Sequence, residues 1–151
     1  MTYVFDTNII FTSLHNQGFD RYIASNYRIE GNDLVISAVT VGELQALALK
    51  RNWGNKRKQQ LLDAIKEYII HPIKMQPILD NYAEIDAYSQ SKLIHKPLPK
   101  GVTARNMGKN DLWIAATTYA INAKLVTTDK DFDHLDKSFL EIDRINLSSF
   151  T

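Results

Sequence analysis

The 151-residue sequence contains no cysteine, and it has only six glycines and four prolines. Without cysteine the chain has no disulfide, no thiolate-bound zinc and no thiol nucleophile, which is typical of a protein from a reducing compartment. The low glycine and proline content excludes a collagen-like or low-complexity chain. We therefore expect an ordinary globular protein of the cytoplasm.

Long apolar runs are also missing. No stretch approaches the roughly 18 apolar residues that a membrane-spanning helix needs, and no basic segment precedes an apolar one at the start, as in a signal peptide. A length of 151 residues with 44% hydrophobic and 23% charged content is typical of one folded unit. No repeat or linker divides the chain, so we expect a single domain over residues 1–151.

Charge of one sign is not in excess, because the formal net charge is only +1. One stretch is nevertheless basic throughout and contains no acidic residue: Lys92, Lys96, Lys100, Arg105 and Lys109. A solvated loop and a contact with a polyanion both explain such a stretch. Residues 95–109 also contain two prolines and two glycines, so we expect a long loop here.

Short β-rich runs alternate along the chain with segments of helical periodicity. The expected strands lie at residues 3–5, 33–37, 69–75, 124–128 and 141–147. The expected helices lie within residues 9–23, 38–51, 55–68, 78–93 and 110–123. The helix within residues 55–68 is expected to carry one apolar face of Leu61, Leu62, Ile65 and Tyr68. This alternation predicts an α/β fold, a three-layer α/β/α sandwich with a mostly parallel central sheet.

Four aspartates fall within eight residues of the segment "VTTDKDFDHLD": Asp129, Asp131, Asp133 and Asp136. Alternating aspartates suggest the calcium loop of an EF-hand. Counted from Asp129, however, the sixth position of that loop requires glycine and holds His134, and the twelfth requires glutamate and holds Leu140. The sequence excludes an EF-hand, so these carboxylates need partners from elsewhere in the chain.

Binding sites of open parallel sheets lie at the carboxyl ends of the strands. Asp6 directly follows the first expected strand, and Glu43 lies a turn or two after the second. Asp129 directly follows the strand expected at residues 124–128. Asp111 opens a helix whose expected N-cap is Asn110, so it can face the same end. We therefore expect four distant carboxylates to converge.

Converging carboxylates repel one another, by roughly 4 kcal/mol for two charges 4 Å apart at an effective dielectric near 20. A cation between them relieves this repulsion. An all-oxygen set without histidine or cysteine suits Mg²⁺ or Mn²⁺ better than zinc. Such ions activate water and stabilise the charge that develops on a phosphate during hydrolysis.

Structural explanations for the same residues remain open. Asp6 can serve as a helix N-cap, and Asp111 in a first turn contributes about 0.3 to 1 kcal/mol through the helix dipole. Asp133 and Asp136 are best explained as caps of the following turn. Glu43 is harder to explain in this way, because its neighbours are apolar and an unpaired buried carboxylate is costly.

Three segments together resemble the successive signatures of PIN-domain nucleases, in particular the VapC-type toxins of type II toxin-antitoxin systems. These are "VFDTNII" (Val4–Ile10), "SAVTVGEL" (Ser37–Leu44) and "NDLWIAATTYAINAKLVTTDKDF" (Asn110–Phe132). The resemblance implies an α/β/α fold and a metal-dependent endoribonuclease that hydrolyses RNA phosphodiester bonds. It also implies a homodimer held inactive by a cognate antitoxin, whose C-terminal segment lies across the active site.

The resemblance also assigns roles to residues. It implies a catalytic set of Asp6, Glu43, Asp111 and Asp129. Asp6 and Asp111 would bind the Mg²⁺ or Mn²⁺ directly, with Glu43 and Asp129 holding water or a second ion. The implied supporting residues are Asn8, Thr127, Thr128 and Asp131. From their charge, and not from the resemblance, we expect the basic residues Lys92, Lys96, Lys100, Arg105 and Lys109, with further cations at Lys50, Arg51 and 56–58, to contact flanking phosphates of the RNA.

Two other functions compete with a nuclease. A phosphatase of the haloacid dehalogenase type also places an aspartate after its first strand, but it needs a second acid two residues later, where this chain has Asn8. A non-catalytic RNA-binding or adaptor domain would bind RNA without needing the carboxylates. Hydrolysis of a small phosphoester identifies the first, and RNA binding without cleavage identifies the second.

Overall fold

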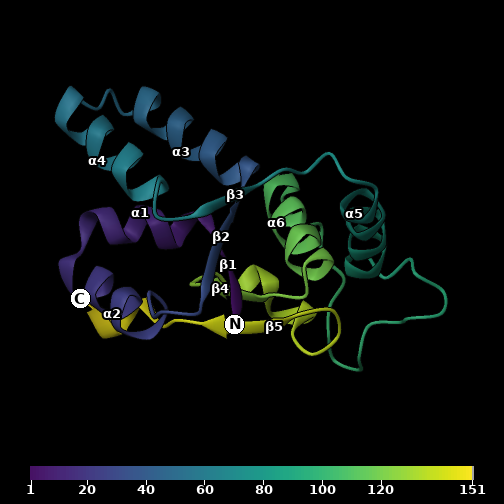
Figure 1. Ribbon diagram of the computed structural model, residues 1–151. Helices are drawn as coiled ribbons and strands as arrows, with labels where there is room; N and C mark the ends of the chain where they lie inside the picture. Colours follow the sequence, from purple (N-terminus) through teal and green to yellow (C-terminus); the bar gives the residue numbers. More distant parts are fainter. Residues whose placement is uncertain (151) are drawn as a thin grey trace.

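The computed structural model describes residues 1–150, in which one five-stranded sheet has the order β3-β2-β1-β4-β5 (Figure 1). The strands are β1 (Thr2–Phe5), β2 (Asp33–Ser37), β3 (Ile69–His71), β4 (Lys124–Thr127) and β5 (Glu141–Arg144). All four pairings are parallel, which goes further than the predicted mostly parallel sheet. The carboxyl ends of all five strands therefore lie along one edge.

Successive residues of the central strands point into two different apolar clusters. One cluster receives Val4, Val35 and Leu125, and the other receives Phe5, Ile36 and Val126. Both faces of the sheet are covered, which explains why these strands are continuous apolar runs without polar alternation.

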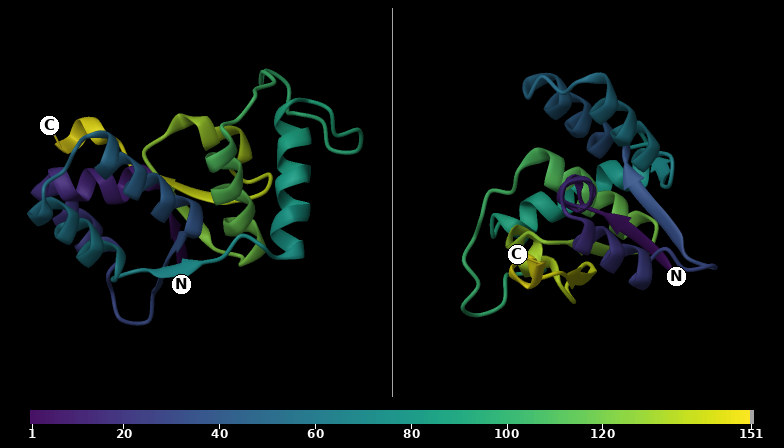
Figure 2. Two further views of the ribbon diagram at one scale, coloured as in Figure 1. Left: turned by 90° about the horizontal axis from the view of Figure 1, so that it is seen from above. Right: turned by 90° about the vertical axis from the view of Figure 1, so that its left-hand side faces the viewer.

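Helices form a layer on each face of the sheet. One layer contains α1 (Thr7–His15), α2 (Gln17–Asn26), α3 (Ala38–Lys50) and α4 (Asn55–Ile65). The other contains α5 (Gln76–Ser89), α6 (Lys109–Ala120) and the 3₁₀ helix η1 (Lys130–Leu135). A second 3₁₀ turn, η2 (Leu147–Phe150), ends the described chain. Figure 2 shows α5 and α6 side by side. The predicted three-layer sandwich is confirmed.

Two helices begin directly at strand ends because the last strand residue or the next one is a cap. Asp6 follows β1 and caps α1, and Ser37 ends β2 and caps α3, each accepting a hydrogen bond from a first-turn amide. The chain therefore turns into each helix at the carboxyl edge of the sheet. This places the first turns of α1 and α3 next to each other at that edge.

Two local expectations were wrong. Helix α6 begins at Lys109 with Gly108 as its N-cap, so Asn110 is not the cap and lies with Asp111 inside the first turn. The apolar face predicted for the helix within residues 55–68, which corresponds to α4, included Leu62. Leu62 is 44% exposed, while Leu61 is buried. Adjacent helical residues point in directions about 100° apart, so the two leucines cannot share one narrow face. Within residues 1–150, no helix has the length and apolar character needed to cross a membrane.

Candidate metal and active site

The buried carboxylate of Asp6 links the ends of β1 and β4. Only 3% of Asp6 is exposed. Its Oδ1 accepts from the Thr7 amide at 2.8 Å, and its Oδ2 accepts from the Thr127 hydroxyl at 2.7 Å. The Thr127 hydroxyl in turn accepts from the Asp129 amide at 2.9 Å. One threonine thus holds two of the predicted site residues in register.

Glu43 approaches the same place from the second turn of α3 and is half-buried. Its Oε1 accepts from the Thr7 hydroxyl at 2.8 Å, and the Thr40 hydroxyl lies 3.1 Å from that of Thr7. Because the Thr7 proton forms the stronger bond with a carboxylate, Thr40 donates to Thr7. Thr7 and Thr40 were missed from the sequence. Thr40 lies three residues before Glu43, so their shared helix face was a usable signal.

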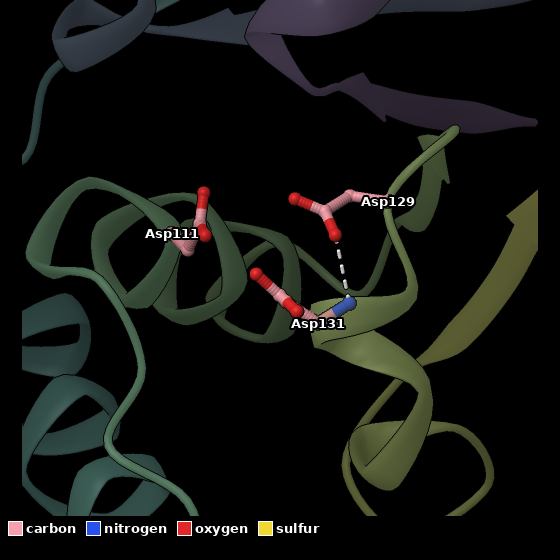
Figure 3. Close-up of side chains that lie close together, drawn as sticks. All are labelled: Asp111, Asp129 and Asp131. Carbon is pink, nitrogen blue, oxygen red and sulfur yellow. Dashed lines mark hydrogen bonds between the residues drawn. The ribbon is translucent and has the colours of Figure 1, made fainter.

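Three carboxylates form the tightest cluster. Oxygens of Asp111, Asp129 and Asp131 all lie within 4.8 Å of one another. Figure 3 shows the three side chains pointing into a common space, Asp111 from α6 and the other two from the turn after β4. Asp129 Oδ1 accepts from the Asp131 amide at 2.9 Å, which fixes the turn between them. From the sequence, Asp131 was expected only to support the site and Asp6 to bind the metal directly. In the structure Asp131 belongs to this cluster, and Asp6 lies outside it.

The electrostatics show that Asp6 and Glu43 adjoin the cluster. Burial is the main cause that raises the pKa of Asp6 to about 6, and the charges of Asp129 and Glu43 raise it further, against the hydrogen bonds from Thr127 and Thr7. Burial likewise raises the pKa of Asp111 to about 7, with contributions from the other four carboxylates. Asp111 is therefore within electrostatic reach of the other four carboxylates at the carboxyl edge of the sheet.

The donor set fits a hard divalent cation. Every ligand atom of the cluster is a carboxylate oxygen, and no histidine or cysteine belongs to it. Mg²⁺ and Mn²⁺ prefer such donors. Burial is the main cause of the raised pKa values of Asp6 and Asp111, and the neighbouring carboxylates add a repulsion that a bound cation would relieve.

The other two aspartates of the turn have structural partners. Asp133 Oδ1 lies 3.0 Å from Arg144 Nε, an exposed ion pair that joins η1 to β5. Asp136 Oδ1 accepts from the Ile142 amide at 3.1 Å. Both contacts stabilise the turn, which agrees with the structural explanation, although Asp133 forms an ion pair and does not cap.

A groove of about 690 Å³ lies between α1 and α3, next to the carboxylates. Thr7, Asn8, Glu43 and Asn110 line one part of it, and Lys50 and Arg51 line another. Asn8 thus faces the groove, and neither its side chain nor that of Thr128 hydrogen-bonds a site carboxylate among residues 1–150. The groove provides a concave surface of mixed polar and apolar side chains next to the acidic cluster.

The five basic residues from Lys92 to Lys109 do not lie together in the structure. Lys96 Nζ donates to the Ser138 carbonyl at 2.7 Å and lies 3.9 Å from the centre of the Phe139 ring. Ser138 and Phe139 border a depression with Met1 and Lys124, at the amino ends of β1 and β4. The structure therefore places Lys96 at the end of the sheet opposite the carboxylates.

The remaining cations of the stretch differ in position. Arg105 donates to the Asp131 carbonyl at 3.2 Å, so it lies beside the cluster. Lys109 is exposed and begins α6, two residues before Asp111. Lys92 and Lys100 are exposed on the loop. Within residues 1–150, Arg105 is thus the cation of this stretch with a contact beside the cluster, and Lys109 starts the helix that carries Asp111.

The fold and the site together define an α/β/α protein with an acidic, cation-compatible centre at the carboxyl edge of a parallel sheet. The sequence pattern of the family described as "PIN domain" matches residues 3–138, and the chain belongs to this family. Membership places it among hydrolases that act on nucleic acids. Comparison with curated proteins finds none that matches.

Solved structures show the same fold. VapBC2 from Rickettsia felis, bound to a DNA fragment from its promoter, has a chain 23% identical with a TM-score of 0.73, covering 95% of this chain and 98% of that one. VapBC-1 from nontypeable Haemophilus influenzae gives the same four values. FitAcB from Neisseria gonorrhoeae is 24% identical with a TM-score of 0.67, covering 93% and 95%. At such low identity these likenesses concern the fold alone.

Proposed function

We propose that this chain is a metal-dependent endoribonuclease. The observation that carries the proposal is the convergence of Asp111, Asp129 and Asp131 within 4.8 Å, with Asp6 and Glu43 close enough to raise the pKa of their neighbours. Membership of the PIN domain family supports hydrolysis of nucleic acid. We further propose that the nucleic acid it cleaves is RNA.

Asp111, Asp129 and Asp131 would hold Mg²⁺ or Mn²⁺, and Asp6 borders the same space as a further ligand. When bound, the cation supplies charge neutralisation at the scissile phosphate and lowers the pKa of a coordinated water. Thr127 orients the Asp6 carboxylate toward the cluster and leaves a lone pair on each of its oxygens. Glu43 Oε1 is held by Thr7, so the second oxygen of Glu43 remains available to accept a proton or orient water.

The similar solved structures suggest protein partners for this chain. The similar structures are described as VapBC and FitAcB assemblies, and one of them as a toxin-antitoxin system. We propose that this chain is the toxin of such a pair, a homodimer, with an antitoxin segment that covers the groove between α1 and α3. Single-stranded RNA would use the exposed cations Lys50 and Arg51 of the same groove.

Cleavage of RNA by the purified protein tests the activity. We expect cleavage with Mg²⁺ or Mn²⁺, none with EDTA, and a loss of at least about 100-fold in Asp6→Asn and Asp111→Asn, because each removes charge from the cation site. Asp133→Asn is the matched control, because Asp133 lies in the same turn but pairs with Arg144. Full activity of both site variants would overturn the assignment.

Two further measurements separate the rival functions. Hydrolysis of a small phosphoester without RNA cleavage would favour a phosphatase, and RNA binding that persists in Asp111→Asn without any cleavage would favour an adaptor.

The toxin assignment is tested by growth. Expression of the chain alone should arrest bacterial growth, and co-expression of its cognate antitoxin should restore growth.

A further inference from the structure

Ser89 and His134 form a buried pair behind the acidic turn. Ser89 is the last residue of α5 and is fully buried, and His134 lies in η1 with 7% exposed. Ser89 Oγ and His134 Nε2 are hydrogen-bonded at 2.7 Å. Because η1 directly follows Asp129 and contains Asp131, this bond connects α5 to the turn that carries two members of the cluster.

The long loop joins the same connection. The Arg105 amide donates to the Ser89 carbonyl at 2.7 Å, and the Arg105 guanidinium donates to the Asp131 carbonyl at 3.2 Å. Met107, which is buried, places its sulfur 3.4 Å from Ser89 Oγ. Arg105 thus spans from α5 to the backbone of Asp131, and Ser89 contacts both the loop and η1.

The pair is suited to hold the turn and not to react with a substrate. Ser89 Oγ is enclosed by the Ile85 carbonyl, the Met107 sulfur and His134, and none of its surface is exposed. A substrate therefore cannot reach this hydroxyl. Among residues 1–150, Ser89 Oγ is the side-chain hydrogen-bond partner of the imidazole ring.

We propose that Ser89, His134 and Arg105 are positioning residues that hold Asp129 and Asp131 in the geometry needed for cation binding. Three contacts carry this inference: the Ser89–His134 bond, the Arg105 amide on α5 and the Arg105 guanidinium on the Asp131 carbonyl. Arg105, expected from the sequence to contact RNA, also engages the backbone of the site. Interactions that orient metal ligands typically contribute 10- to 100-fold to metal affinity.

Calorimetric titration of Mn²⁺ into the metal-free full chain tests the proposal, which rests on the proposed cation site. His134→Phe keeps a ring of similar size but removes the hydrogen bond, and Arg105→Gln removes the guanidinium. We expect each to weaken Mn²⁺ binding by about 10-fold or more. His134→Gln, which can still reach Ser89, should recover most of the affinity. Lys92→Gln, an exposed change on the same loop, is the control and should bind like wild type.

Other readouts distinguish positioning from a general loss of stability. Urea unfolding of the metal-free variants gives their stability, and affinity is compared only where the variant is fully folded. If His134→Phe does not fold, Arg105→Gln on the loop still tests the proposal. Wild-type Mn²⁺ affinity in Arg105→Gln and His134→Phe would overturn this proposal alone. No Mn²⁺ binding by wild type would overturn the proposed cation site and this proposal with it.

Discussion

The hydroxyl of Thr127 donates a 2.7 Å hydrogen bond to the buried carboxylate of Asp6, across 121 positions of sequence. Thr127 ends β4 and Asp6 directly follows β1, so the bond exists only because these two strands pair. The same hydroxyl accepts from the Asp129 amide. Thr127 therefore connects the carboxyl ends of β1 and β4 at the site by hydrogen bonds.

Thr127→Val should destabilise the protein by about 1 to 3 kcal/mol, because a buried carboxylate loses a donor while the side-chain shape is kept. The pKa of Asp6 should rise further above about 6, since the Thr127 bond is the largest influence that lowers it. Urea unfolding measures the first effect. Thr128→Val is the control, with a change within about 0.5 kcal/mol. Equal stability of the two variants would contradict the role of Thr127.

Thr7→Val should slow RNA cleavage by roughly 10-fold or more, because Glu43 loses the donor that orients it. Within residues 1–150 the hydrogen bonds of the Thr7 hydroxyl go to Glu43 and Thr40 and not to the three clustered aspartates, so Mn²⁺ affinity should stay near that of wild type. Thr7→Ser retains the hydroxyl and should restore the rate. Rate constants under saturating Mn²⁺ provide the measurement. If Thr7→Ser is as slow as Thr7→Val, the hydroxyl is not the cause.

Asp111→Asn should stabilise the metal-free protein relative to wild type, and more so as pH rises. The folded-state pKa of Asp111 is raised to about 7, so between about pH 4 and pH 7 the native state binds more protons than the unfolded state. Stability from this group is present below the unfolded pKa and is lost as pH rises through the folded pKa. Urea unfolding in EDTA across this range measures the difference.

The comparison with wild type at each pH matters because His134 has the opposite effect. Burial lowers the pKa of His134 to about 4, so its contribution to stability is present above the unfolded pKa of 6.5 and is lost as pH falls toward 4. Both proteins contain His134, and its effect cancels in the difference. A difference between Asp111→Asn and wild type that does not change with pH would contradict the raised pKa of Asp111.

Lys109→Gln should weaken RNA binding and reduce the slope of log affinity against log salt by about 1, because Lys109 is an exposed cation at the start of α6. Lys96→Gln should leave both quantities unchanged, since Lys96 lies at the amino ends of the strands on Phe139. Binding is measured with a non-cleaving Asp111→Asn background at several salt concentrations. Equal losses in the two variants would contradict this division of the basic stretch.

Local pattern was enough for the architecture and for part of the site. Apolar runs and helical periodicity predicted the three-layer sandwich, because each element must bury an apolar face. Asp6, Glu43 and Asp129 were recognisable as site candidates because each follows a strand, and the carboxyl ends of parallel strands share one edge. These inferences need only the order of elements along the chain, which the sequence by itself determines.

Contacts between distant segments depended on the tertiary structure. Asp131 joins the tightest carboxylate cluster, and Lys96 folds away to the opposite end of the sheet, although both belong to charged stretches that look uniform in the sequence. Ser89 and His134, 45 positions apart, meet because α5 packs over η1. Periodicity specifies which face of an element is buried, but the partner across the interface is decided only when the layers pack together.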